Sequence, residues 1–138
     1  MRASDCIFFQ LAKASQNAIR FWGQKVSTLG VTAAQSMILR FLLEEGPMNS
    51  REIGEKTQLD SATLTGIIDR LAAQGLVSRA EHPDDRRAIL VGLTENGTET
   101  ARKVSALSEE ANREFLKEFS REDEGKLRGF LVRIRDKG

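Results

Sequence analysis

The fold of this chain is decided by one stretch, residues 49–93, which reads NSREIGEKTQLDSATLTGIIDRLAAQGLVSRAEHPDDRRAILVGL. Its first half predicts helices at about 50–57 and 61–74, because capping residues open both segments and apolar residues follow at helical spacing. Its second half changes period, so 76–79 and 88–93 are predicted strands with a polar, proline-containing tip between them. Helix, turn, helix, strand, charged tip and strand in this order predict a winged helix-turn-helix.

Two helices are predicted before this stretch. A first helix covers about residues 4–27 and is apolar on more than one face, so it must be covered on more than one side. Thr32 and Gln35 have the spacing of a capping box that opens a second helix. Gly46 and Pro47 end it, because glycine suits the left-handed position after a helix and proline cannot continue one.

Two more helices are predicted after the wing. Thr94 caps a long charged helix that extends to Phe119 with one apolar stripe. Ser120 marks the turn into a last helix, whose apolar residues are expected to face inward: Leu127, Phe130, Leu131 and Ile134. The fold class is therefore mainly α with a small β-wing.

Composition limits the classes of function. With 138 residues, 40% hydrophobic and 30% charged, the chain suits one soluble globular domain. No apolar run approaches the ~20 residues of a membrane span, and a single cysteine, Cys6, fits a reducing cytoplasm. The net charge is only +1, so nucleic-acid binding must depend on where the charges lie.

The second helix of the central stretch is the predicted recognition helix for duplex DNA. Its apolar stripe must face the core, which leaves Ser61, Thr63 and Thr65 near the exposed start, where small hydroxyl groups can approach bases and phosphates. A helix N-terminus also favours a phosphate.

Basic side chains flank this helix. Arg86 and Arg87 lie at the predicted wing tip and are expected to reach the minor groove, with Asp85 holding one of them by a charge-assisted hydrogen bond. Further candidates for backbone contacts, which position a protein without specifying sequence, are Arg51, Arg70 and Arg79.

Five segments of the sequence resemble the MarR family of transcription regulators. Residues 60–65, 69–71 and 75–77 are similar to its recognition-helix region, and 83–87 and 93–97 are similar to its wing and the exit from it. The resemblance implies recognition contacts at Ser61, Thr63 and Thr65, and a wing pair at Asp85 and Arg87, with Arg87 in the minor groove. It also implies pseudo-palindromic operators and, mostly, repressors that small ligands release.

A homodimer is implied by the resemblance and expected from the residues. The first helix offers more apolar surface than a chain of this size can cover alone, and the long helix projects beyond any core that one subunit can build. We expect 1–31 to form an N-terminal dimerisation helix, 32–97 the winged helix-turn-helix DNA-binding domain, and 98–138 the C-terminal dimerisation helices, in one compact chain rather than independent domains.

The resemblance leaves two hypotheses for the signal. One is a small aromatic or phenolic effector in a pocket between the dimerisation helices and the DNA-binding domain, lined by Phe9, Trp22, Met37, Arg40 and Phe41, with Arg40 holding a carboxylate. Aromatic and Met side chains at helical spacing are more often plain core, and Arg40 equally suits the exposed surface.

The alternative is thiol-based peroxide sensing by Cys6, because its surroundings resemble the organic-hydroperoxide-sensing branch. That branch pairs its cysteine with tyrosines, whereas this chain has no tyrosine and carries Gln10 and Arg20 four and fourteen residues after Cys6. An inert buried thiol is the simpler interpretation.

Two other classes are less favoured by the sequence. One His, one Cys and no Tyr provide few nucleophiles and no metal-ligand cluster, so we expect no enzyme, metal or cofactor, and His82 beside Asp84 and Asp85 lacks a dry pocket. A winged helix used only for protein contact would need an apolar exposed face on residues 61–74, where the sequence has a polar one.

Overall fold

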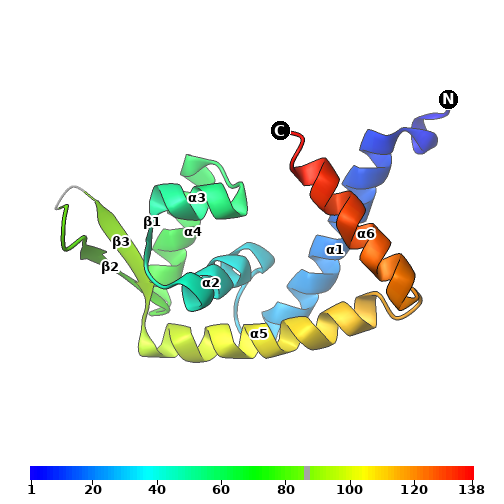
Figure 1. Ribbon diagram of the computed structural model, residues 1–138. Coiled ribbons are helices and arrows are strands. Elements are labelled where there is room, and N and C mark those ends of the chain that lie inside the picture. The colour runs from blue at the N-terminus through cyan, green and yellow to red at the C-terminus, as the bar shows by residue number, and fades with distance from the viewer. Residues whose placement is uncertain (86–87) are drawn as a thin grey trace. The chain divides into compact units, whose positions relative to one another are not determined.

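The computed structural model of the chain describes residues 1–85 and 88–138 (Figure 1). Contacts divide it into two compact units, Met1–Leu107 and Ser108–Gly138. The first unit contains the winged helix and the helices before it. The second contains the end of one long helix and the last helix. Among the described residues, no helix is long and apolar enough to cross a membrane.

The first unit begins with two helices close to those predicted. A short 3-10 turn, η1 (Ala3–Asp5), precedes α1 (Ile7–Ser27), so the α-helix starts three residues later than residue 4. The capping box of α2 (Ala33–Glu45) is confirmed: the Gln35 N–H donates to Thr32 Oγ1 at 3.2 Å, and the Thr32 N–H donates to Gln35 Oε1 at 3.0 Å. Gly46 follows with φ 82°, a value that favours glycine.

The helix-turn-helix is confirmed as α3 (Ser50–Thr57) and α4 (Ser61–Ala73). Asn49 caps α3 by accepting the Glu52 N–H at 2.9 Å. The turn between the helices is tight because Gln58 adopts the left-handed conformation, with φ 62°. Gly75, with φ 74°, follows the end of α4 as the sequence predicted.

The wing is a three-stranded antiparallel sheet in the order β1-β3-β2. The predicted hairpin forms from β2 (Val77–Glu81) and β3 (Ile89–Leu93), each shifted slightly from the expected bounds. The sequence did not predict β1 (Met48–Asn49), whose Met48 pairs with Val91. A strand of two residues shows no alternation of apolar and polar side chains, so its pattern carries no signal.

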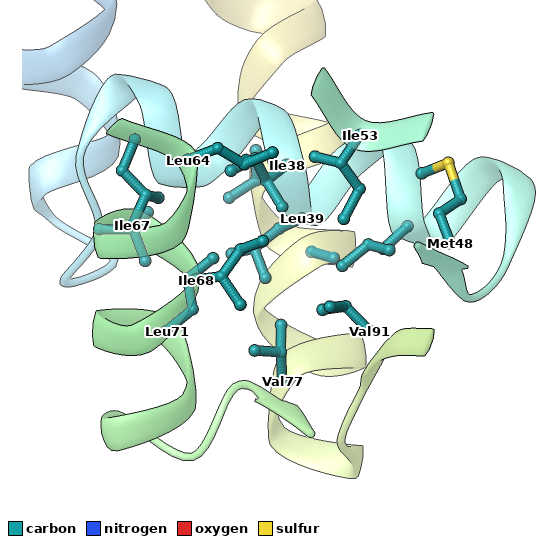
Figure 2. Close-up of a cluster of buried hydrophobic side chains, with 14 of the residues drawn as sticks. Ile38, Leu39, Met48, Ile53, Leu64, Ile67, Ile68, Leu71, Val77 and Val91 are labelled. Atoms are coloured by element: carbon teal, nitrogen blue, oxygen red, sulfur yellow. The ribbon is translucent and has the colours of Figure 1, made fainter. Parts of the chain in front are cut away.

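The apolar stripe of α4 forms one wall of the core (Figure 2). Its four side chains, Leu64, Ile67, Ile68 and Leu71, are at most 5% exposed. They face Ile38 and Leu39 of α2 and Ile53 of α3, while Val77 and Val91 close the cluster from the sheet. Burying one such side chain contributes about 1.5–3 kcal/mol, so this cluster fixes which face of α4 points outward.

The start of α5 (Glu95–Phe115) is locked to the end of the recognition helix. Thr94 Oγ1 donates to the carbonyl of Gly75 at 2.6 Å and accepts the Gly97 N–H at 3.0 Å, which confirms Thr94 as the cap. A Cβ on Gly97 would lie 1.8 Å from the carbonyl oxygen of Leu76, so only glycine fits there. This close approach explains the glycine in the segment after the wing.

The second unit differs from the prediction in two respects. The long helix α5 ends at Phe115 rather than Phe119, and a turn leads to α6 (Arg121–Arg135), capped by Ser120 through the Asp123 N–H at 3.1 Å. Of the four α6 side chains expected to face inward, three are instead exposed in this single chain, Phe130 at 54%, Leu131 at 47% and Ile134 at 43%, and Leu127 is half-buried. Two helix segments alone offer too little apolar surface to cover them.

Candidate nucleic-acid interface and ligand pocket

The start of α4 presents the predicted recognition residues to solvent. Ser61, Thr63 and Thr65 are all exposed, because the buried stripe of the helix occupies the opposite face. Two of the three hydroxyl groups already donate: Thr63 Oγ1 to Asp60 Oδ2 and Thr65 Oγ1 to the Ser61 carbonyl, both at 2.9 Å. These two oxygens are therefore oriented to accept hydrogen bonds, as from an adenine or cytosine amino group.

Asp60 occupies the N-terminus of α4. Its Oδ1 accepts the Thr63 N–H at 2.9 Å, so this helix end already carries a carboxylate rather than an open site for a phosphate. The hydrogen bond from the Thr63 backbone, followed by that from its hydroxyl group, lowers the pKa of Asp60 below its usual value. The Thr63 N–H is thus already bonded within the chain, and the expected phosphate contact at this N-terminus stays a prediction.

A hollow of ≈ 680 Å³ lies between the outer faces of α3 and α4, and Ser50, Arg51, Gln58, Ser61 and Thr65 are among its lining residues. The side chain of Arg51 is 87% exposed and pairs with Glu55 at 3.3 Å. An exposed pair at this helical spacing contributes only about 0.3–0.5 kcal/mol, so Arg51 can leave Glu55 for a phosphate at little cost.

The two predicted backbone arginines beyond α3 have different surroundings. Arg79 of β2 forms an ion pair with Asp69 of α4, which joins the wing to the recognition helix. Arg70 lies exposed on α4, with its guanidinium group 4.0 Å from the position of a Cβ on Gly66. Arg79 is therefore tied to α4 by an ion pair, while the Arg70 side chain is exposed.

The wing tip carries the remaining predicted DNA contacts. Arg86 and Arg87 lie outside the described residues, and Asp85 is exposed. The hairpin is extended past β2 and β3 by the His82 N–H, which donates to the Ala88 carbonyl at 3.0 Å. His82 Nδ1 accepts the Asp84 N–H at 3.0 Å, so this imidazole supports the turn.

A largely apolar pocket of ≈ 380 Å³ lies among the first three helices of the first unit. It is lined from α1 by Ile19 and Trp22, from α2 by Ala33, Ala34, Met37 and Phe41, and from α3 and the turn after it by Lys56, Thr57 and Leu59. Trp22, Met37 and Phe41, three of the five residues proposed for an effector, are thus brought together.

The other two proposed effector residues do not line this pocket. Phe9 is 49% exposed near the start of α1, and Arg40 lies on α2, where it pairs with Glu44 at 3.4 Å. The cation at the pocket is instead Lys56, which the sequence does not single out because a lysine in a short polar helix has the pattern of ordinary solvated surface.

Cys6 lies at the junction of η1 and α1, where it is partly exposed. Arg20 stands fourteen residues further along the same helix, about 20 Å at 1.5 Å per residue, and donates to Asn17 Oδ1 at 2.8 Å. Arg20 of the same chain therefore cannot neighbour the thiol. Gln10 Nε2 donates to the Ser4 carbonyl at 3.3 Å, so it orders η1. Within residues 1–85 and 88–138, no three His, Cys, Asp or Glu side chains form a possible metal site.

A recognition helix packed on a three-stranded wing defines the class of a winged-helix DNA-binding protein. The sequence pattern of the MarR family matches residues 31–89. One similar protein is the HTH-type transcriptional repressor NicR of Pseudomonas putida, 35% identical over 105 residues. Another is the organic hydroperoxide resistance transcriptional regulator of Bacillus subtilis, 31% identical over 97 residues. These matches span 71% and 70% of this chain and 66% of either relative.

Solved structures agree over nearly the whole chain. A probable transcriptional regulator from Pseudomonas aeruginosa has a TM-score of 0.88 at 34% identity, covering 96% of this chain and 99% of its own. BpsR of Bordetella bronchiseptica, whose DNA binding is described as regulated by 6-hydroxynicotinic acid, has a TM-score of 0.92 at 25% sequence identity. The match covers 100% of this chain and 99% of BpsR. A MarR mutant from Escherichia coli complexed with operator DNA has a TM-score of 0.84 at 25% sequence identity. The match covers 91% of this chain and 90% of the mutant.

The chain therefore belongs to the MarR family of winged helix-turn-helix transcription regulators. The family and the fold are those of DNA-binding regulators rather than enzymes.

Proposed function

We propose that the chain is a dimeric repressor that binds a pseudo-palindromic duplex operator through α4 and the wing, and that a small aromatic acid releases it. The observation that carries DNA binding is the orientation of α4. Its apolar stripe is buried, so Ser61, Thr63 and Thr65 face outward at the helix start, beside the exposed Arg51 and Arg70. The name of the similar repressor NicR supports the repressor role.

Dimerisation is supported by apolar side chains that a single chain leaves in water. Ile7, Phe8 and Phe9 of α1 are 53%, 78% and 49% exposed, and Phe130 of α6 is 54% exposed. Exposed large apolar side chains of this kind, present on each of the two units, are typical of protein interfaces. A second copy would also present a second α4, and one DNA turn of ~34 Å between the paired recognition helices would fit two half-sites.

Release by an aromatic acid is supported by the pocket among α1, α2 and α3. Its volume of ≈ 380 Å³ lies in the range of small-molecule sites, about 300–1,000 Å³, and its wall combines Trp22, Phe41 and Met37 with the ammonium group of Lys56. The similar BpsR is described as regulated by 6-hydroxynicotinic acid, a compound of this class.

The proposal is tested by selecting duplexes from a random pool with purified protein, then adding 6-hydroxynicotinic acid to the complex. We expect enriched, inverted-repeat sequences and a fall in affinity with the acid. Failure to enrich any duplex would contradict operator binding, and enriched duplexes that no aromatic acid displaces would contradict only the release.

Thiol sensing by Cys6 is the second candidate. It is favoured by the partial exposure of Cys6 and by the similarity to a regulator of organic hydroperoxide resistance. The test compares wild type with Cys6→Ser after cumene hydroperoxide. Release of the wild type alone supports sensing, whereas equal operator affinity of both proteins after oxidant rejects it.

A further inference from the structure

The pocket among α1, α2 and α3 has few polar groups, and most of them are occupied. Trp22 Nε1 donates to Ser36 Oγ at 2.8 Å, so the indole N–H points into the α1–α2 contact. Thr57 Oγ1 donates to the Ile53 carbonyl at 2.8 Å and accepts the Leu59 N–H at 3.4 Å. Of the described side chains that line the pocket, Lys56 alone carries a charge.

Lys56 is at the same time part of a link between two helices. Its Nζ lies 2.7 Å from Oε1 of Glu45, the last residue of α2, while Lys56 itself belongs to the last turn of α3. The two side chains are 42% and 40% exposed, so water screens the pair and a competing anion can replace Glu45. An ammonium group has three donors, and one contact to Glu45 leaves others for a ligand.

We infer that a small aromatic carboxylate binds this pocket by taking Lys56 from Glu45, with its ring against Trp22, Met37 and Phe41. This inference rests on the proposed release by aromatic acids and names the residue that selects for the charge. A neutral phenol would fill the apolar part and leave Lys56 with Glu45. An inorganic anion would meet Lys56 but gain nothing from the apolar wall.

Exchange of the ion pair also gives the ligand a route to the DNA-binding helices. The Glu45–Lys56 pair ties the end of α2 to α3, and α3 packs on the recognition helix α4 through Ile53 and Leu64. A ligand that binds Lys56 better in the untied state shifts the population towards that state. Ligand and operator then oppose each other through the position of α3.

Two substitutions have opposite expected effects. Lys56→Met removes the cation with little change in side-chain length, and it should weaken binding of 6-hydroxynicotinate roughly tenfold, the loss expected for one hydrogen bond to a charged group. Glu45→Gln removes the competitor and should strengthen the binding of the same acid. Neither variant should change the binding of 6-hydroxynicotinamide, the uncharged analogue of the probe.

Trp22 provides the readout, because it is the single tryptophan of the chain and lines the pocket. Its fluorescence is titrated with the acid and with the amide in wild type and in both variants. Lys103→Met is the matched control, because it removes a lysine from another exposed ion pair, on α5. Thermal unfolding by circular dichroism checks that each variant is folded.

The outcomes separate the inference from the proposed function. The inference is supported if Lys56→Met weakens and Glu45→Gln strengthens binding of the acid, if neither changes binding of the amide, and if Lys103→Met binds both as wild type does. Equal affinities of all four proteins for the acid overturn the role of Lys56 while release by aromatic acids stands. Release from DNA without any response of Trp22 places the ligand elsewhere and overturns the inference. No binding and no release overturn both the inference and the effector half of the proposed function.

Discussion

The apolar stripe of α4 is at most 5% exposed, whereas Phe8 of α1 and Phe130 of α6 are 78% and 54% exposed. The winged helix thus completes its core within one chain, with side chains from α2, α3, α4 and the sheet, joined by Val26 of α1 and by Ala101 and Val104 of α5. The terminal helices carry apolar faces that one chain leaves uncovered. The difference indicates that α4 is held by packing within the chain, while in the proposed dimer the spacing between the two copies of α4 would depend on the terminal helices.

Gly97→Ala should show the largest effect on the self-contained region. The new Cβ would meet the Leu76 carbonyl at 1.8 Å, so the start of α5 must move away from the end of the recognition helix. We expect a loss of about 3 kcal/mol or more in the free energy of unfolding, because backbone cannot give way cheaply.

Gly125→Ala provides the matched control in α6, where a Cβ would meet nothing within 4 Å. Alanine has the higher helix propensity, so this variant should gain about 0.5–1 kcal/mol. Both are measured by urea unfolding. Similar changes in the free energy of unfolding of the two variants would contradict the difference between the tightly packed Gly97 and the uncrowded Gly125.

Phe130→Glu should have the next largest effect, on assembly rather than folding. A charge on an apolar interface costs several kcal/mol in binding, so we expect at least about a hundredfold weaker dimer. Sedimentation velocity across a range of concentrations measures it. Glu118→Ala on the exposed turn before α6 serves as the control, and an unchanged association by Phe130→Glu would show that α6 is not the interface.

The terminal helices also show where prediction from sequence stops. The helical spacing of Leu127, Phe130 and Ile134 identifies an apolar face, but spacing does not state whether the same chain or another covers it. For α4, by contrast, the strands and helices around it supply the covering residues within one chain, and the predicted stripe of Leu64, Ile67, Ile68 and Leu71 is confirmed as buried.

The sequence predicts contacts between residues close in the chain, such as helix caps, but it does not predict which side chains of different elements will meet. The caps at Thr32, Asn49 and Thr94 follow from a hydroxyl or amide three residues before an N–H, a purely local relation. Ion pairs such as Asp69 with Arg79 join elements that only the fold brings together. Lys56 and Trp22 likewise line one pocket only because the fold brings their helices together, and nothing in the sequence indicates that the two residues are neighbours.

Arg87→Ala should weaken operator binding by about 1–3 kcal/mol without changing the unfolding midpoint. The reason is a lost minor-groove or phosphate contact at the wing tip. Arg133→Ala on α6 removes the same charge far from the wing in sequence and is the control. Fluorescence anisotropy with a labelled duplex measures both, and equal affinities would remove Arg87 from the interface.

Asp60→Asn should show the smallest effect, visible only in acid. The folded state lowers the pKa of Asp60, so its ionised cap adds stability above about pH 4, and this contribution is lost as the pH falls through the lowered value. Asparagine caps equally well without titrating. Urea unfolding between neutral and acid pH should therefore show a smaller acid loss in Asp60→Asn than in wild type or Asp5→Asn. Identical pH profiles would show that the cap does not depend on charge.

The central claim is that α4 and the wing of two protomers bind one duplex, and a salt titration of that complex tests it most directly. Anisotropy of a selected duplex should give two protomers per duplex and an affinity that falls with salt at a log–log slope steeper than about −3, because bound phosphates release counterions. Saturable binding with this stoichiometry and slope is the predicted result. No binding to any selected or random duplex at low salt would contradict the account.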